Sequence, residues 1–137
     1  MTAFRLTLQP RFNETDALGH INNTVIPAWF EAGRTPIFEI FNPSLALSRW
    51  NLIVAGYQIN FSAPTFYGKD VAITTEVVRL GQASFDLRQR CWQDDKLTAQ
   101  AVTTMVHYNY DAAASEAIPA VVRAQLAALL VMENEVE

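Results

Sequence analysis

The chain offers little cysteine or histidine chemistry. Its 137 residues include one cysteine, Cys91, and two histidines, His20 and His107. A single cysteine excludes an intrachain disulfide and the disulfide framework of small secreted proteins. These three residues also lack the spacing of a zinc site, so we expect no metal centre.

Positive charge and long apolar runs are scarce too. The 14 acidic residues outnumber the 10 basic ones, and the formal net charge of −4 argues against a nucleic-acid-binding surface. No apolar run reaches the ~18 residues that span a bilayer, and the first residues lack the basic start and apolar region of a signal peptide. We therefore expect a cytoplasmic protein that binds neither nucleic acid nor membrane.

The chain does contain enough apolar residues for one core. Half of the sequence is hydrophobic and 18% is charged, which is typical of a folded globular protein. The length fits a single domain over residues 1–137. Apolar residues recur at helical spacing over about 24–41, where Pro36 predicts a break near Thr35. A last helix is expected over about 119–132.

The rest of the chain has the alternating pattern of strands. The run from Phe4 to Phe12 predicts a first strand, interrupted near Pro10. Four further runs are separated by turn signals and predict an antiparallel meander over about 51–110. These runs cover residues 57–63, 70–80, 84–92 and 96–110. A long helix must bury its apolar stripe against such a sheet, which predicts an α+β domain.

One segment, from Glu14 to Thr24, carries most of the chemistry. It reads ETDALGHINNT and places Asp16 in a loop shortly before the predicted helix, with Asn22 and Asn23 as good helix caps. A helix N-terminus favours negative charge, because free N–H groups and the helix dipole point to it. A carboxylate beside such a terminus can attack a carbonyl or activate water while amides hold the oxyanion. The pattern therefore indicates acyl transfer.

The same segment resembles a motif of the hot-dog-fold acyl-CoA thioesterases. The likeness is to the 4-hydroxybenzoyl-CoA thioesterase-like branch, whose pattern D-x-x-G-H-[VI]-N-N followed by W-F-E-x-x-R matches Asp16–Asn23 and Trp29–Arg34. Two later segments also match the family pattern. The first contains INFSAP at 59–64 and YGKD at 67–70, and the second is VVRLGQASF at 77–85. The resemblance runs from about residue 4 to about residue 110. It implies a hot-dog fold, with an antiparallel sheet wrapped around a central helix, and hydrolysis of acyl-CoA to a free acid and coenzyme A.

The resemblance assigns the reaction centre to three residues of the motif. Asp16 would be the base or the nucleophile, and the sequence leaves both roles open. The backbone N–H of Asn23 would hold the oxyanion, and His20 would orient Asp16 or relay a proton. In the plainer alternative, Asp16 bonds nearby amides, Asn23 caps the helix, and His20 makes one structural hydrogen bond.

Six further residues are candidates for binding the substrate. The two in the motif are Gly19, which permits a special backbone conformation or a close approach, and Asn22, which caps the helix or contacts the substrate. Aromatic side chains could line an acyl pocket or only pack in the core, and polar residues near sheet turns could meet the phosphates of coenzyme A. These four are Tyr57, Phe61, Arg79 and Ser84.

Glu31 is the reserve catalytic acid, because some hot-dog thioesterases of other branches place that acid on the central helix. Glu31 and Arg34 are three residues apart, so the plainer expectation is an ion pair along one helix face.

The resemblance also has implications for cofactors and for the oligomeric state. It implies no metal or prosthetic group, with coenzyme A only as part of the substrate, and a homodimer or homotetramer with active sites between subunits. Two alternatives to an acyl-CoA thioesterase stay open. One is an acyl-ACP thioesterase, and the other is a non-catalytic acyl-CoA binding domain.

Overall fold

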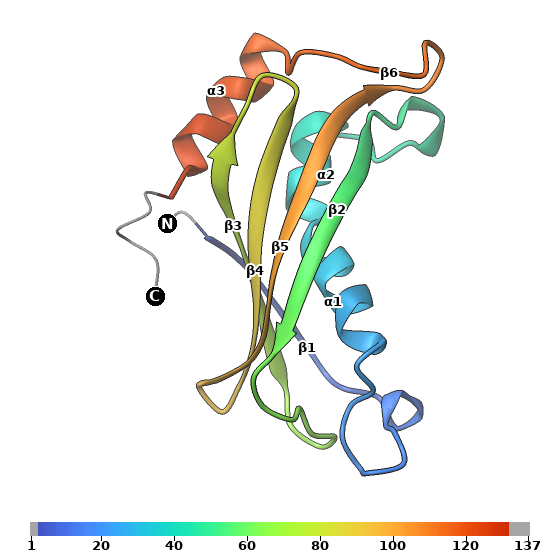
Figure 1. The fold of residues 1–137 in the computed structure, drawn as a ribbon, viewed down its shortest axis with the longest axis vertical. Coiled ribbons are helices and arrows are strands. Elements are labelled where there is room, and N and C mark those ends of the chain that lie inside the picture. Colours follow the sequence, from blue (N-terminus) through green and yellow to red (C-terminus); the bar gives the residue numbers. More distant parts are fainter. Residues whose placement is uncertain (1–2, 132–137) are drawn as a thin grey trace.

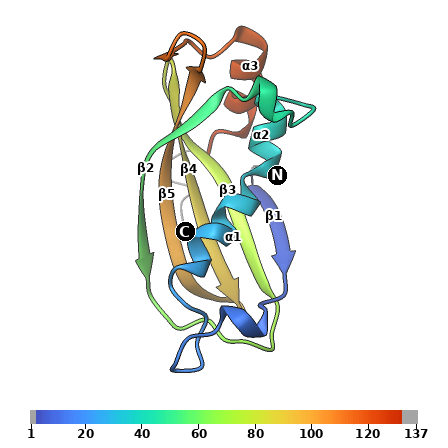
Figure 2. The ribbon, with the colours of Figure 1, turned by 90° about the vertical axis from the view of Figure 1, so that its right-hand side faces the viewer.

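The computed structural model describes residues 3–131 and shows a curled antiparallel sheet with two helices along its concave side (Figures 1 and 2). The strands are β1 (Ala3–Leu8), β2 (Leu52–Phe61), β3 (Val71–Leu80), β4 (Ser84–Gln93), β5 (Lys96–Asn109) and β6 (Ala114–Ser115). The helices are α1 (Val25–Gly33), α2 (Thr35–Phe41) and α3 (Ala120–Leu129), with 3-10 turns at Phe12–Glu14 and Leu47–Arg49. The architecture is the predicted one, a sheet wrapped around a central helix.

The central helix is divided at Arg34, next to the expected break at Thr35. Pro36 has no N–H to donate, so it cannot continue the hydrogen bonds of α1 into α2. Two side chains of the sheet bond carbonyls at the end of α1 instead. Gln89 Nε2 donates to the Phe30 carbonyl at 2.7 Å, and Thr75 Oγ1 donates to the Gly33 carbonyl at 3.1 Å.

The strand order in the sheet is β1-β3-β4-β5-β2, and the short β6 pairs with β5. The predicted meander is therefore right for β3, β4 and β5, but wrong for β2. Strand β2 pairs antiparallel with β5, from Leu52 opposite His107 to Phe61 opposite Ala99, and so forms the far edge. Residues 62–70 cross one end of the sheet to reach β3, which lies beside β1 (Figure 1).

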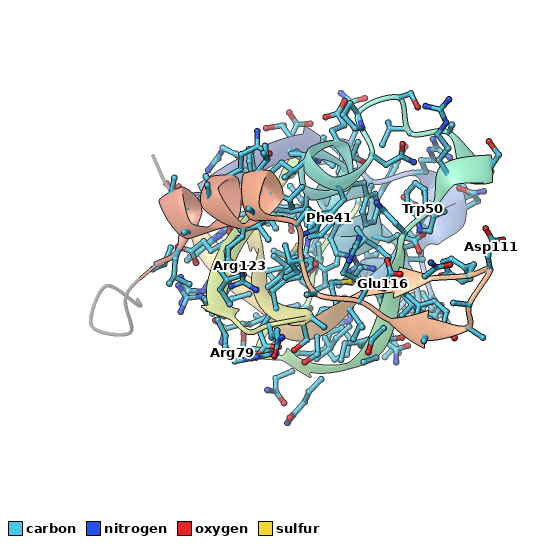
Figure 3. All side chains as sticks on the ribbon, turned by 90° about the horizontal axis from the view of Figure 1, so that it is seen from above. Phe41, Trp50, Arg79, Asp111, Glu116 and Arg123 are labelled. Atoms are coloured by element: carbon cyan, nitrogen blue, oxygen red, sulfur yellow. The ribbon has the colours of Figure 1, made fainter. Side chains whose placement is uncertain are left out.

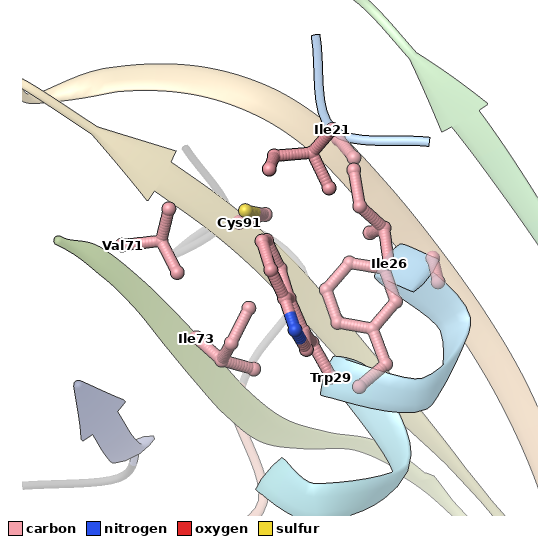
Figure 4. Close-up of a cluster of buried hydrophobic side chains, with 9 residues drawn as sticks. Ile21, Ile26, Trp29, Val71, Ile73 and Cys91 are labelled. Atoms are coloured by element: carbon pink, nitrogen blue, oxygen red, sulfur yellow. The ribbon is translucent and has the colours of Figure 1, made fainter. Parts of the chain in front are cut away.

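Buried apolar side chains form two clusters along the helices. The cluster under α1 includes Ile26, Trp29, Ile73 and Cys91 (Figure 4). The other lies under α2 and α3 and includes Leu126 of α3. The last helix, expected to reach about residue 132, ends at Leu129, and residue 132 lies outside the described residues. Burial raises the pKa of the Cys91 thiol above its ordinary value.

Candidate active site

The motif segment forms a loop that closes on itself at one end of the sheet (Figure 1). The Asn22 N–H donates to the Glu14 carbonyl at 2.8 Å, and the Asp16 N–H donates to the His20 carbonyl at 2.7 Å. The Ile21 N–H then donates to the Thr65 carbonyl at 2.8 Å. These bonds fix the motif loop against the segment that connects β2 to β3.

Asp16 organises the tip of this loop with one of its two carboxylate oxygens. Its Oδ1 accepts hydrogen bonds from the backbone N–H groups of Leu18 at 2.8 Å and His20 at 3.0 Å. Gly19 has φ of +81°, a conformation that strains residues with a Cβ, and open space surrounds the position where that Cβ would lie. Gly19 therefore serves the loop conformation rather than a close approach. Oδ2 of Asp16 accepts no hydrogen bond from residues 3–131.

The start of α1 lies directly after the loop. Asn22 Oδ1 accepts from both the backbone N–H and the hydroxyl of Thr24, each at 2.9 Å. Asn22 thus holds a turn just before α1, whose N-cap residue is Thr24. The Asn23 N–H has no acceptor in the described part of the chain, and Asn23 is exposed. This is a backbone donor at a helix N-terminus that remains open to a ligand.

Asp16 and Asn23 line the same groove, of about 500 Å³. His20 and Ile26 line it from the motif loop and α1. The opposite wall is formed by residues 61–65, which begin with Phe61 at the end of β2. The structure thus brings together the three predicted catalytic residues and one predicted substrate-binding residue.

The imidazole of His20 contacts Phe66 rather than the Asp16 carboxylate. The two rings meet edge to face, with centroids 5.3 Å apart, and no hydrogen bond joins the imidazole to any of residues 3–131. The connection between His20 and Asp16 runs through the His20 backbone. The side chain lies on the groove and is accessible from it.

Glu14 does not pair with Asp16 in a two-carboxylate site. Its Oε1 accepts from the Arg11 N–H at 2.6 Å, and its Oε2 accepts from Trp29 Nε1 at 3.2 Å. Oε1 thus closes the 3-10 turn before the motif loop, and Oε2 connects this turn to α1. Glu14 therefore has a structural role.

Glu31, Arg34 and Tyr57 lie on a second cavity, of about 240 Å³, between α1 and the edge strand β2. The predicted ion pair between Glu31 and Arg34 is wrong, because no nitrogen of Arg34 lies within 4.0 Å of the Glu31 carboxylate. Arg34 caps the end of α1, and its guanidinium turns inward and donates from Nη1 to Gln89 Oε1 at 3.1 Å. Burial lowers the pKa of Arg34, against the opposing effect of the nearby Glu31 charge.

Arg79 and Ser84 lie at the opposite end of the sheet from Asp16, beside the turn that joins β3 to β4 (Figures 1 and 3). Arg79 donates to Asp86 and to the Ser84 hydroxyl. Burial alone would raise the pKa of Asp86, but hydrogen bonds from Arg79 and Thr104 lower it. The hydrogen bond to Asp86 raises the pKa of Arg79. Within one chain these two residues do not join the groove beside Asp16.

Sequence reasoning missed the second wall of the groove. Residues 62–64 belong to a matching segment, INFSAP, and Thr65 follows it, but the pattern indicates no role for these residues. Their contribution depends on the crossing from β2 to β3, which alternation within a strand does not reveal. Gln89 was also missed, although it is fully buried and connects α1, β3 and Arg34.

Within residues 3–131, no group of three or more histidine, cysteine, aspartate or glutamate side chains is placed to hold a metal ion. In the same part of the chain, no helix is long and apolar enough to cross a membrane.

Comparison with known proteins gives the family of this chain. The family model of the thioesterase-like superfamily matches residues 10–126, which include the motif loop, α1 and strands β2 to β6. The chain belongs to this superfamily. The predicted family and the predicted enzyme class, a thioester hydrolase, are thereby confirmed.

Solved structures agree with the superfamily assignment. A predicted thioesterase from Bacillus stearothermophilus is 34% identical, with a TM-score of 0.93 over 95% of this chain and 98% of its own. A thioesterase from Thermus thermophilus, complexed with coenzyme A and Zn, is 24% identical, with a TM-score of 0.82 over 91% of this chain and 92% of its own. A 1,4-dihydroxy-2-naphthoyl-CoA thioesterase from Synechocystis is 16% identical, with a TM-score of 0.78 over 91% of this chain and 96% of its own. The last two show the shared fold alone. Together these structures confirm the α+β hot-dog fold, and no curated protein matches the chain.

Proposed function

We propose that this member of the thioesterase-like superfamily hydrolyses acyl-CoA, with Asp16 as the base or the nucleophile. One observation carries the proposal. The Asp16 carboxylate, with Oδ2 unbonded within residues 3–131, and the Asn23 N–H, which likewise has no acceptor there, line one groove. A thioester carbonyl between them would have a carboxylate on one side and a helix N-terminal donor on the other.

The chemistry needs no group beyond water and these residues. Either Asp16 removes a proton from water, which attacks the carbonyl, or Asp16 attacks and the resulting anhydride is hydrolysed. In both routes negative charge develops on the carbonyl oxygen, and the Asn23 N–H donates to it. In the first route Asp16 returns its proton to the thiolate that leaves as the carbon–sulfur bond breaks. In the second route this bond breaks as the anhydride forms, the thiolate takes a proton from solvent, and water then hydrolyses the anhydride. Both routes give a carboxylate, the thiol of coenzyme A and one proton. We propose that no metal or prosthetic group takes part.

Coenzyme A as the carrier is supported by a structural relative. The Thermus thermophilus thioesterase was solved in complex with coenzyme A, and it shares the fold of this chain. The acyl-ACP alternative requires a basic surface for an acidic carrier protein, and the net charge of −4 argues against one. Acyl-CoA therefore remains the proposed substrate.

Asp16→Asn tests the proposal. Asparagine keeps an Oδ1 that can accept from Leu18 and His20, so the loop should hold its conformation while the carboxylate is lost. We expect kcat for thiol release from an acyl-CoA panel to fall by roughly a hundredfold or more. Circular dichroism and the urea midpoint of the variant should match those of the wild type.

Asp111→Asn is the matched control, because Asp111 is exposed and belongs to the turn between β5 and β6, at the opposite end of the sheet from the motif loop (Figure 1). It should retain wild-type kcat. An Asp16→Asn variant that also retains wild-type kcat would contradict the mechanism. Glu31 would then be the next candidate for the catalytic acid. Tight acyl-CoA binding by the wild type without thiol release would instead support the binding-domain alternative, and release from acyl-ACP alone would identify the other carrier.

A further inference from the structure

Arg34 is a buried cation without a carboxylate partner among residues 3–131. Three arginine side chains of the described residues are at least nine-tenths buried, namely Arg34, Arg88 and Arg90, with 6%, 5% and 6% of their surface exposed. Arg88 forms a salt bridge with Glu76, and Arg90 lies 4.0 Å from the same carboxylate. Arg34 has no carboxylate of the described chain within 4.0 Å. A buried charge of this kind calls for a counter-charge, because desolvation without a partner is costly.

The hydrogen bonds of Arg34 are incomplete as well. Its guanidinium donates one bond, from Nη1 to Gln89 Oε1, and its buried Nε has no acceptor among residues 3–131. The side chain lines the 240 Å³ cavity between α1 and β2, whose other walls are mostly apolar and include Phe30 and Ile59. The cavity is therefore mostly apolar, with one buried cation in its lining.

This cavity and the groove at Asp16 share no lining residue, but the same two elements, α1 and β2, contribute to both. Along α1, Ile26 lines the groove, and Pro27 and Phe30 line the cavity. Asn23, just before the helix, lines the groove, and Arg34, at its C-terminal cap, lines the cavity. On β2 the end of the strand lines the groove, and the middle of the strand lines the cavity. Asn23 and Arg34 are eleven residues apart, which corresponds to a distance of about 16 Å along a helix axis. Helical side chains point back toward the N-terminus, so the guanidinium lies closer to the groove than that.

We propose that Arg34 binds a carboxylate at the far end of the acyl chain, and that the preferred substrates are thioesters of medium-length dicarboxylic acids. The inference rests on the proposed thioesterase function, since the other end of the chain must lie at Asp16 and Asn23. A planar guanidinium matches a carboxylate better than it matches a hydroxyl or a methyl group. Glu31 stands at the exposed rim of the cavity, where solvent screens its repulsion of such a ligand.

The test compares thioesters of equal length that differ only in the terminal group. We expect kcat/KM of the wild type to be higher for suberoyl-CoA than for octanoyl-CoA, and higher for adipoyl-CoA than for hexanoyl-CoA, by roughly tenfold or more. Arg34→Met should remove this preference while octanoyl-CoA is still hydrolysed, and Arg34→Lys should restore part of it. Arg90→Met is the matched control, with the same burial but on the outer face of β4, and it should keep the preference.

A second readout separates this inference from the proposed function. Free suberate should raise the melting temperature of the wild type more than octanoate does, and Arg34→Met should abolish that difference. If no thioester is hydrolysed but suberate still shows the Arg34-dependent shift, the thioesterase proposal fails and the carboxylate site stands. A wild type that shows no preference for the dicarboxylic thioesters overturns the inference, whether or not Arg34→Met folds. An Arg34→Met variant that slows both thioesters equally and dissociates an oligomer also overturns it, because the counter-charge then comes from a second copy.

Discussion

Two glycines, one in the motif loop and one at the end of α1, differ in what a methyl group would contact. Gly19 in the motif loop has φ of +81° and open space around its missing Cβ, so an alanine there would be strained by its backbone alone. Gly33 at the end of α1 has an ordinary φ, but its Cβ would lie 2.7 Å from Ile73 Cγ2 and 3.2 Å from Gln89 Nε2. One glycine sets a conformation, and the other allows the helix to approach the sheet.

Gly19→Ala and Gly33→Ala should therefore both destabilise the protein, for different reasons. We expect a loss of about 1 kcal/mol for Gly19→Ala from the left-handed backbone, and about 1–3 kcal/mol for Gly33→Ala from overpacking. Urea denaturation measures both. Gly56→Ala is the control, since Gly56 has neither a positive φ nor an atom within 4 Å of its Cβ position. Equal stability of all three variants would contradict this interpretation.

At the scale of elements, Gln89 stabilises the central helix where Pro36 divides it. This fully buried side chain donates to the Phe30 carbonyl and to Thr75 Oγ1, and accepts from Arg34. Gln89→Leu removes all three bonds and leaves a buried carbonyl without a donor. We expect a loss of about 1–3 kcal/mol in the free energy of unfolding. Gln58→Leu on the exposed face of β2 should change it by less than about 0.5 kcal/mol, and a similar loss from both would contradict the role of Gln89.

The elements also show where sequence reasoning ends. Proline chemistry at Pro36 predicted the helix break, and alternation predicted β3 to β5, because both signals are local. The partner of β2 was not predictable in the same way, since a period of two assigns side chains to faces but does not choose a neighbouring strand. The motif indicated Asp16, His20 and Asn23, and the structure places all three on one groove. The role of Gln89 was not predictable from β4 alone, because its side chain bonds the Phe30 carbonyl of α1.

At the scale of the whole molecule, the edge strand β2 is the most exposed of the long strands of the sheet. All but two of its ten residues are exposed, and they include apolar side chains such as Ile53 and Val54 at the outer edge of the strand order. An exposed, apolar edge strand can pair with another copy of the chain. We propose that the homodimer, or a homotetramer built from it, forms through this edge.

The double substitution Ile53→Lys with Val54→Lys tests the assembly. Lysine charges on an edge strand oppose pairing, so the variant should sediment as a smaller species than the wild type. Sedimentation velocity over a range of concentrations measures this directly. Val121→Lys, on the exposed surface of α3, is the control and should sediment like the wild type. A wild type that sediments as a monomer at every concentration would contradict the proposed assembly.

The burial of the single cysteine has a practical consequence for assays. Cys91 has none of its surface exposed, and it is the only thiol of the chain. A colorimetric reagent that detects released coenzyme A should therefore see no background from intact protein. A variant that has lost its fold would give one equivalent of colour before any substrate is added. The same cuvette thus distinguishes an enzyme that is inactive from one that has unfolded.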